Sequence, residues 1–176
     1  DLDPPQKKQL PKGALVLVID HSGSMTGLKL QMAKSAAAAS VRMLSRRDQV
    51  GVVTFDSRAD WLVPMTDAAD KDAIIDRIGR LGGGGGTDMY PGMEYAAEAF
   101  RDADTPVKHV ILLTDGRTGG LDCRPVAAAM ADQGITISTV AVGDHADFKL
   151  LQTIAQIAAG RFDHVADHHQ LPHRLV

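Results

Sequence analysis

The chain has 176 residues and a formal net charge of -3, and aromatic residues make up only 4% of it. This length accommodates one well-buried domain but not two full ones, so we expect a single domain. Lys and Arg are scattered, and few aromatic side chains are available to stack on bases, which argues against nucleic acid as a partner. No apolar run approaches the roughly 18 residues of a membrane-spanning helix, so we expect no membrane insertion by this fragment.

The beginning of the chain and its cysteine content leave the cellular compartment open. Residues 1–13 form a polar, Pro-containing lead-in that has no initial Met and no signal-peptide character. We expect residues 14–176 to be a domain excised from a longer protein, whose other parts could anchor it to a membrane. Cys123 is the only cysteine, so no intramolecular disulfide can form.

The first half of the chain alternates between apolar strands and helical patterns. Residues 14–19 are apolar without polar alternation, which is typical of a strand buried on both faces. Apolar residues at helical spacing predict a helix over 28–43, and a second strand follows at 50–55. A short turn leads to an antiparallel strand at 59–63, which we expect to stop at Pro64.

The second half continues this alternation. Helices are predicted within 70–80, 89–100, 125–132 and 147–159, strands at 107–114, 135–142 and 162–165, and the start of a final helix at 167–176. We expect Gly134 and Gly160 to end the helices that precede them. The pattern predicts an α/β fold: a doubly wound, mostly parallel sheet with one antiparallel edge strand and helices on both faces.

Oxygen-bearing side chains follow two of the apolar strands. Asp20, Ser22 and Ser24 come directly after the first strand on alternate residues, and Asp115 follows a later strand. In doubly wound sheets, ligands bind outside the carboxyl ends of the strands near the point where strand order reverses, so both carboxylates should reach one rim. Thr87, at the end of a run of five glycines, can complete the set. We predict one metal centre made of these five side chains.

The donor atoms of this predicted centre are all hard oxygens. Such a set suits Mg²⁺, Mn²⁺ or Ca²⁺ and is poor for zinc or copper. Mg²⁺ is the first expectation because the site is compact and rich in water, whereas Ca²⁺ usually gathers six to eight oxygens. The glycine run would let its loop approach the ion without side-chain clashes and shift when a partner arrives.

The same residues also have ordinary structural interpretations. Asp20, Ser22 and Ser24 could cap backbone amides in a strand-to-helix turn, and Thr87 or Asp115 alone is as compatible with a cap as with a ligand. Their joint order along the chain favours the metal site.

Other polar residues are assigned simpler roles. Asp88 is expected to cap the helix that follows it, His21 to face solvent, and Cys123 to be inert. A histidine trio near the end of the chain is more typical of a solvated helix face than of a second metal site. The trio consists of His168, His169 and His173.

Over residues 14–165 the sequence resembles a von Willebrand factor type A domain, the family that includes integrin inserted domains. The family's metal-ion-dependent adhesion site (MIDAS) has the pattern Asp-x-Ser-x-Ser, a Thr on a second loop and an Asp on a third, and no position is missing here. The sequence around residues 81–90 and 109–116 is most similar to that of bacterial members of the family, which occur in larger, often membrane-tethered proteins. The resemblance implies that a partner's Asp or Glu carboxylate fills an open coordination position on the ion.

We therefore expect a monomeric, non-catalytic domain that binds a protein partner in a divalent-cation-dependent way. One alternative is a module that docks an internal partner within an assembly, as chelatase subunits similar to this family do. A metal-dependent hydrolase is less favoured. Ser22 stands where phosphoryl-accepting enzymes have a second Asp, the serine of Gly-x-Ser-x-Gly is misplaced by one residue, and the glycine run lacks a Gly-Lys-Ser/Thr ending.

Overall fold

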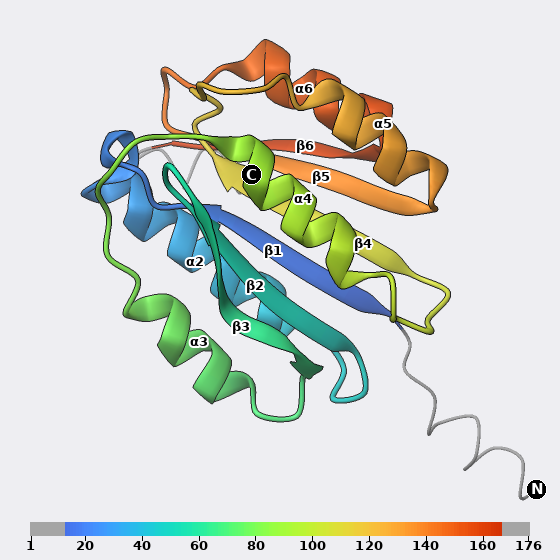
Figure 1. The fold of residues 1–176 in the computed structure, drawn as a ribbon. Coiled ribbons are helices and arrows are strands. Elements are labelled where there is room, and N and C mark those ends of the chain that lie inside the picture. Colours follow the sequence, from blue (N-terminus) through green and yellow to red (C-terminus); the bar gives the residue numbers. More distant parts are fainter. Residues whose placement is uncertain (1–12, 167–176) are drawn as a thin grey trace, which may run out of the picture.

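The computed structural model describes residues 13–166, which form a six-stranded sheet between two layers of helices (Figure 1). The strands are β1 (Ala14–Asp20), β2 (Gln49–Phe55), β3 (Ala59–Asp67), β4 (Lys108–Thr114), β5 (Ile135–Val142) and β6 (Ala159–Val165). The helices are η1 (Gly23–Met25), α2 (Leu28–Arg42), α3 (Lys71–Gly79), α4 (Met89–Ala99), α5 (Arg124–Asp132) and α6 (Phe148–Ile157). Most of the lead-in, the predicted final helix and the histidine trio lie outside the described residues.

The sheet has the predicted mixed architecture, with the order β3-β2-β1-β4-β5-β6. Only β3 pairs in the antiparallel direction, and it forms one edge. The strand β1 lies in the middle, between β2 and β4. After β1 the chain passes to α2 on one face, and after β4 it passes to α5 on the other. The loops therefore diverge between β1 and β4, which opens a crevice at the carboxyl ends of these two strands.

The two faces of the sheet are covered by separate hydrophobic clusters. All seven residues of β1 are buried, and successive side chains point to opposite faces, so Val16 and Leu17 belong to different clusters. Small residues of α2, including Ala33 and Ala37, pack against one face. Met93 of α4 and other residues of α4, α5 and α6 pack against the opposite face. Burial on both faces fixes β1 and holds its carboxyl end in place.

The strand β3 extends beyond the predicted end at Pro64 and continues to Asp67. The prediction was wrong because β3 is an edge strand, where the missing N–H of a proline costs no ladder hydrogen bond. The pairing with β2 also contains a bulge at this point. Val50 pairs with Thr66 and Val52 with Val63, so Pro64 lies in a stretch with one extra residue on β3.

Gly160 does not end the helix α6, as the sequence suggested. The helix ends at Ile157 and Gly160 already belongs to β6, which begins at Ala159. A Cβ at Gly160 would lie 1.9 Å from the carbonyl oxygen of Ile137. Glycine is therefore required here for the close approach of two backbones rather than for a helix cap.

The predicted end of α5 at Gly134 agrees with the structure, since α5 stops at Asp132 and Gly134 has a φ of +81°.

No helix among residues 13–166 combines the length and the apolar composition needed to cross a bilayer.

Candidate metal centre

Asp20 is fixed at the carboxyl end of β1 by two hydrogen bonds. It is fully buried, and its Oδ1 accepts a hydrogen bond from the Ser22 N–H at 2.9 Å. Its Oδ2 accepts from the Thr114 hydroxyl at 2.6 Å. Thr114 lies here because Ile19 of β1 pairs with Leu113 of β4, which sets the next two residues side by side. The neighbouring strand therefore orients the carboxylate.

Thr114 is an orienting residue that sequence reasoning did not single out. Its hydroxyl donates to Asp20 and accepts a hydrogen bond from the Gly116 N–H at 3.0 Å. The hydroxyl is completely buried, so its proton direction is set by these two partners.

The two predicted serine ligands lie next to each other. Ser22 is buried and Ser24, in the short helix η1, is exposed, and their Oγ atoms are 3.2 Å apart. Neighbouring ligands of an octahedral Mg²⁺ with bonds of about 2.1 Å are separated by about 3 Å. The spacing of the two hydroxyls is therefore compatible with adjacent positions on such an ion.

The glycine run is docked onto the loop that carries the serines. The Gly84 N–H donates to the carbonyl of His21 at 2.9 Å, and the Gly23 N–H donates to the carbonyl of Gly85 at 2.9 Å. The ring of His21 also donates from Nδ1 to the carbonyl of Gly82 at 2.9 Å. His21, which was expected to face solvent, is partly exposed and also ties these two loops together.

Gly85 shows why this loop is rich in glycine. Its φ is +92°, and a Cβ there would lie 2.9 Å from Oδ2 of Asp56 in the β2–β3 turn. A side chain would be strained by the backbone conformation and would also meet Asp56. The loop therefore passes close to the β2–β3 turn, where a side chain at this position would not fit.

Thr87 ends this loop and lies against the loop that follows β4. Its carbonyl accepts a hydrogen bond from the Gly119 N–H at 3.0 Å. The Thr118 hydroxyl on the same loop accepts from the N–H of Met89 at 2.9 Å. Within residues 13–166 the hydroxyl of Thr87 makes no hydrogen bond, although its side chain is half-buried.

Asp115 begins the third loop and is fully buried. Its Oδ1 accepts a hydrogen bond from the Arg117 N–H at 3.0 Å, while its Oδ2 lies 3.4 Å from the Nζ of Lys29 on α2. Sequence reasoning missed Lys29, because nothing in its position on a helix indicates that it faces a loop 86 residues away. The carboxylate thus has an ammonium partner already present within the chain.

The electrostatic state of Asp20 follows from its burial. Loss of solvent raises its pKa above the ordinary value, and hydrogen bonds from Ser22 and Thr114 oppose this shift. The nearby carboxylate of Asp115 raises the pKa of Asp20 further. Two buried carboxylates thus share one end of the sheet, and an additional positive charge there would stabilise both in their ionised forms.

The donor set fits a hard divalent cation with few anionic ligands. Within the described part of the chain, no three His, Cys, Asp or Glu side chains are grouped so that they could hold a metal ion. An ion at this place would therefore rely on hydroxyl oxygens beside the two carboxylates. Each carboxylate oxygen has about two lone-pair sites, so the hydrogen bonds described above still leave acceptor capacity.

Asp88 and Cys123 lie in surroundings that agree with the structural roles expected of them. The Asp88 carboxylate accepts a hydrogen bond from the N–H of Tyr90 at the beginning of α4, which confirms the predicted cap. Cys123 is buried, and this burial raises the pKa of its thiol to about 12, in agreement with an inert cysteine.

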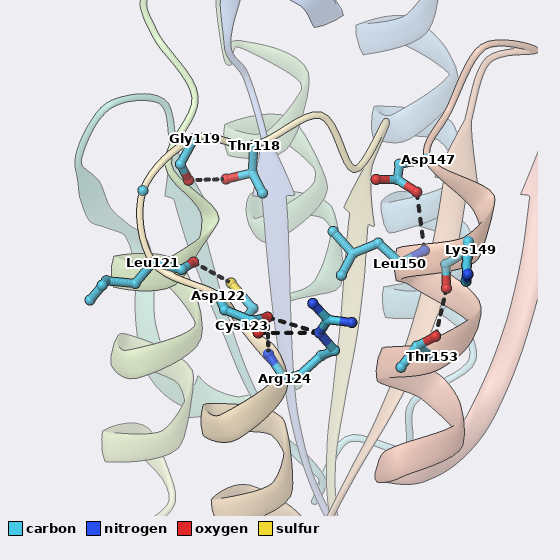
Figure 2. A pocket seen from close by; sticks show the side chains of 11 residues that line it. Thr118, Gly119, Leu121, Asp122, Cys123, Arg124, Asp147, Lys149, Leu150 and Thr153 are labelled. Atoms are coloured by element: carbon cyan, nitrogen blue, oxygen red, sulfur yellow. Dashed lines mark hydrogen bonds and ion pairs between the residues drawn. The ribbon is translucent and has the colours of Figure 1, made fainter.

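A polar pocket of about 460 Å³ is lined by later residues of the loop that Asp115 begins, from Thr118 onward. It lies between the loop that follows β4 and the first turns of α6, and Figure 2 shows Arg124 and Asp122 joined by an ion pair along one side of it. On the other side, Asp147 accepts from the Leu150 N–H and caps α6. The Asp147 N–H donates to the carbonyl of Asp115 at 2.7 Å, so one residue that lines the pocket is hydrogen-bonded to the backbone of a predicted ligand.

The doubly wound sheet, with its hydroxyls and carboxylates at the switch point, defines a class of α/β binding domains. The chain belongs to the von Willebrand factor type A domain family, whose model matches residues 14–174. Domains of this family typically mediate interactions between proteins.

Individual relatives support this assignment. An uncharacterised protein from Synechocystis is 34% identical over 155 residues, which cover 86% of this chain and 37% of that protein. The chain thus spans about a third of the length of that relative. The von Willebrand factor type A structure from Catenulispora acidiphila has a TM-score of 0.81 and 26% identity, and covers 93% of this chain and 41% of that one.

A third comparison concerns metal binding. Proximal thread matrix protein 1 from the mussel byssus, solved with a zinc-occupied MIDAS motif, has a TM-score of 0.73 and 21% identity. The match covers 94% of this chain and 46% of that one. At this identity the likeness demonstrates the shared fold, and the zinc belongs to the mussel protein.

Proposed function

We propose that this domain is a non-catalytic protein-binding module whose contact depends on a divalent cation, with Mg²⁺ as the first candidate and Mn²⁺ or Ca²⁺ as others. In this proposal the ion is held by side chains from three loops, and a carboxylate of the partner protein completes its coordination. The proposed ligands are Asp20, Ser22, Ser24, Thr87 and Asp115.

The observation that carries the proposal is the convergence of these three loops at the switch point of the sheet. The first two are joined through Gly84 and Gly85, and the second and third through Thr87 and Gly119. Segments that are 28 to 95 residues apart, from Asp20 to Thr87 and on to Asp115, thereby reach one rim. The ligand sets of hard cations are oxygen-rich, and this rim offers hydroxyl and carboxylate oxygens together.

A cation with only two carboxylates among its ligands retains affinity for a further anion, and this is the chemistry that it would supply when bound. The chain's own residues then determine access. Ser24 is exposed, whereas Asp20 and Asp115 are buried, so a partner would approach from the side of Ser24. The polar pocket lined by Thr118 and Asp147 would accept the partner's flanking residues.

The direct test has two stages. Isothermal titration calorimetry with MgCl₂ and MnCl₂ measures ion binding by the wild-type domain and by Ser22→Ala, with Ser138→Ala as a matched control on β5, away from the centre. We expect heat for the wild type and the control and a strongly weakened response for Ser22→Ala. Absence of ion binding in the wild type would refute the proposal.

The second stage concerns the partner. The immobilised domain is incubated with an extract of the source organism in Mg²⁺, and bound proteins are eluted with EDTA, with the Ser22→Ala domain treated in parallel. We expect a protein that is eluted by EDTA and not retained by the variant, and whose binding is lost when one Asp or Glu is replaced by its amide. A partner retained equally in EDTA would show that binding uses another surface.

The alternative of a docking module inside an assembly uses the same site and differs in its partner. It predicts that the EDTA-released partner is encoded or assembled with the parent chain rather than presented by an external surface. The hydrolase alternative predicts turnover of simple esters or phosphates in Mg²⁺, and such turnover would overturn the non-catalytic assignment.

A further inference from the structure

Lys29 is the one ammonium that reaches the candidate centre in the described part of the chain, at 3.4 Å from Oδ2 of Asp115. Its side chain is 29% exposed, whereas that of Asp115 is fully buried, so the pair is only partly screened by solvent. Arg117, two residues after Asp115, is directed away from the centre, because its Nε donates to the carbonyl of His145 at 3.0 Å.

The backbone of Gly143 helps to position the side chain of Lys29. Its aliphatic stem lies across the backbone of Gly143, at the end of β5, where a Cβ would come within 2.9 Å of Cε. Gly143 is in turn held by its N–H, which donates to the carbonyl of Val165 at 2.8 Å. The glycine thus leaves a channel along which the lysine stem reaches Asp115.

The ammonium changes the charge that an incoming ion meets. Asp20 and Asp115 are both buried at the same end of the sheet, and the ammonium of Lys29 offsets one of these two carboxylates. A divalent cation that uses Asp115 must therefore displace the ammonium or bind beside it, and either event costs electrostatic free energy.

We infer that Lys29 is a tethered internal cation that stabilises Asp115 in the ion-free domain and competes with the divalent ion for this carboxylate. Lys29 is a positioning residue in this scheme, and its role rests on the proposed cation-dependent function. The consequence is that competition from Lys29 lowers the affinity of the centre for the ion. The ion is then bound firmly only when a partner's anionic group is added to its ligands.

The test compares Lys29→Met with Lys29→Arg and with Lys34→Met. Methionine keeps much of the stem and removes the charge, and arginine keeps the charge. Lys34 lies on the same helix but donates to the carbonyl of Gly79, so its replacement changes net charge by the same amount away from Asp115. Titration calorimetry with MgCl₂ and MnCl₂ gives the affinities, and calorimetric melting in EDTA and in 10-fold excess ion gives stability.

We expect Lys29→Met to bind the ion about tenfold more tightly than the wild type, which corresponds to about 1.4 kcal/mol. In EDTA the same variant should melt at a lower temperature, because Asp115 then lacks its ammonium. The ion-induced rise in melting temperature should be larger than in the wild type. Lys29→Arg and Lys34→Met should remain near the wild-type affinity.

The outcomes separate this inference from the proposed function. If the wild type binds the ion and Lys29→Met binds it equally or more weakly, the competition is refuted while the proposed function stands. If only Lys29→Met binds the ion, the competition is supported and the wild-type domain is not ion-dependent by itself. If neither binds it, both proposals are wrong.

Discussion

Replacing Asp20 by Asn should make the ion-free domain more stable while it abolishes stabilisation by the ion. Burial raises the pKa of Asp20, which means that its ionised form is disfavoured in the folded state, and Asp115 adds repulsion. This penalty is present above the raised pKa and disappears as the pH falls below it. An amide of the same shape removes the charge and can still accept the Ser22 N–H, and its NH2 can donate to the Thr114 oxygen in place of the hydrogen bond that Thr114 now donates.

The expected magnitudes follow from simple linkage. Removing the charge of one buried carboxylate is expected to raise the free energy of unfolding by about 1 kcal/mol, which corresponds to a rise of about 2–4 °C in the melting temperature of a domain of this size. An ion at 100 times its dissociation constant adds about 2.7 kcal/mol to the wild type, which corresponds to about 5–10 °C. In EDTA, Asp20→Asn should therefore melt at a higher temperature than the wild type. In Mg²⁺ it should lack the further rise that the ion gives to the wild type.

Differential scanning calorimetry in EDTA and in MgCl₂ measures both shifts. Asp60→Asn, an exposed position on β3, provides the same chemical change away from the centre and should behave as the wild type. If Asp20→Asn melts below the wild type in EDTA and still gains stability from the ion, the reasoning about this carboxylate is wrong.

Three further predictions concern residues outside the centre. Burial lowers the pKa of His109, so the unfolded chain binds more protons than the folded chain as the pH falls through about 6.5, and the folded state loses stability. His109→Gln should lessen this loss of unfolding free energy between pH 7.5 and 5.5, as measured by urea titrations. An unchanged loss would contradict this explanation. The thiol of Cys123, with a pKa of about 12, should react with Ellman's reagent at pH 8 only after unfolding, and rapid reaction of the native protein would refute its inertness. Gly160→Ala should cost about 3 kcal/mol in unfolding free energy, because its Cβ meets a backbone carbonyl, whereas Gly79→Ala has open space and should be nearly neutral, so equal effects would count against the close approach.

Much of the fold could be predicted because its central strands are buried on both faces. The apolar runs that end at Asp20 and Asp115 leave little choice of structure, and their alternation with helical patterns indicates a parallel sheet. The boundaries that failed depend on tertiary context. Pro64 continues a strand because it lies at an edge, and Gly160 serves a backbone approach that only the folded chain creates.

The candidate ligands could be proposed from the sequence because each follows a recognisable strand or glycine run, whereas the residues that contact them in the structure could not be found in this way. Lys29 acts on Asp115 from another element, and its helical position carries no sign of this. Thr114 carried a weak signal: aligning the ends of the two strands would have placed its hydroxyl beside Asp20. Local sequence patterns do not reveal contacts between residues that only the topology of the fold brings together.

The outer strand β3 limits how this domain can associate with other chains. Pro64 has no N–H to offer a further strand, and the bulged pairing around it interrupts the regular edge. Recognition by β-augmentation, in which a peptide extends a sheet, is therefore obstructed along this border. The same feature guards this edge against edge-to-edge aggregation, so further strand pairing is left to the opposite edge, which β6 forms.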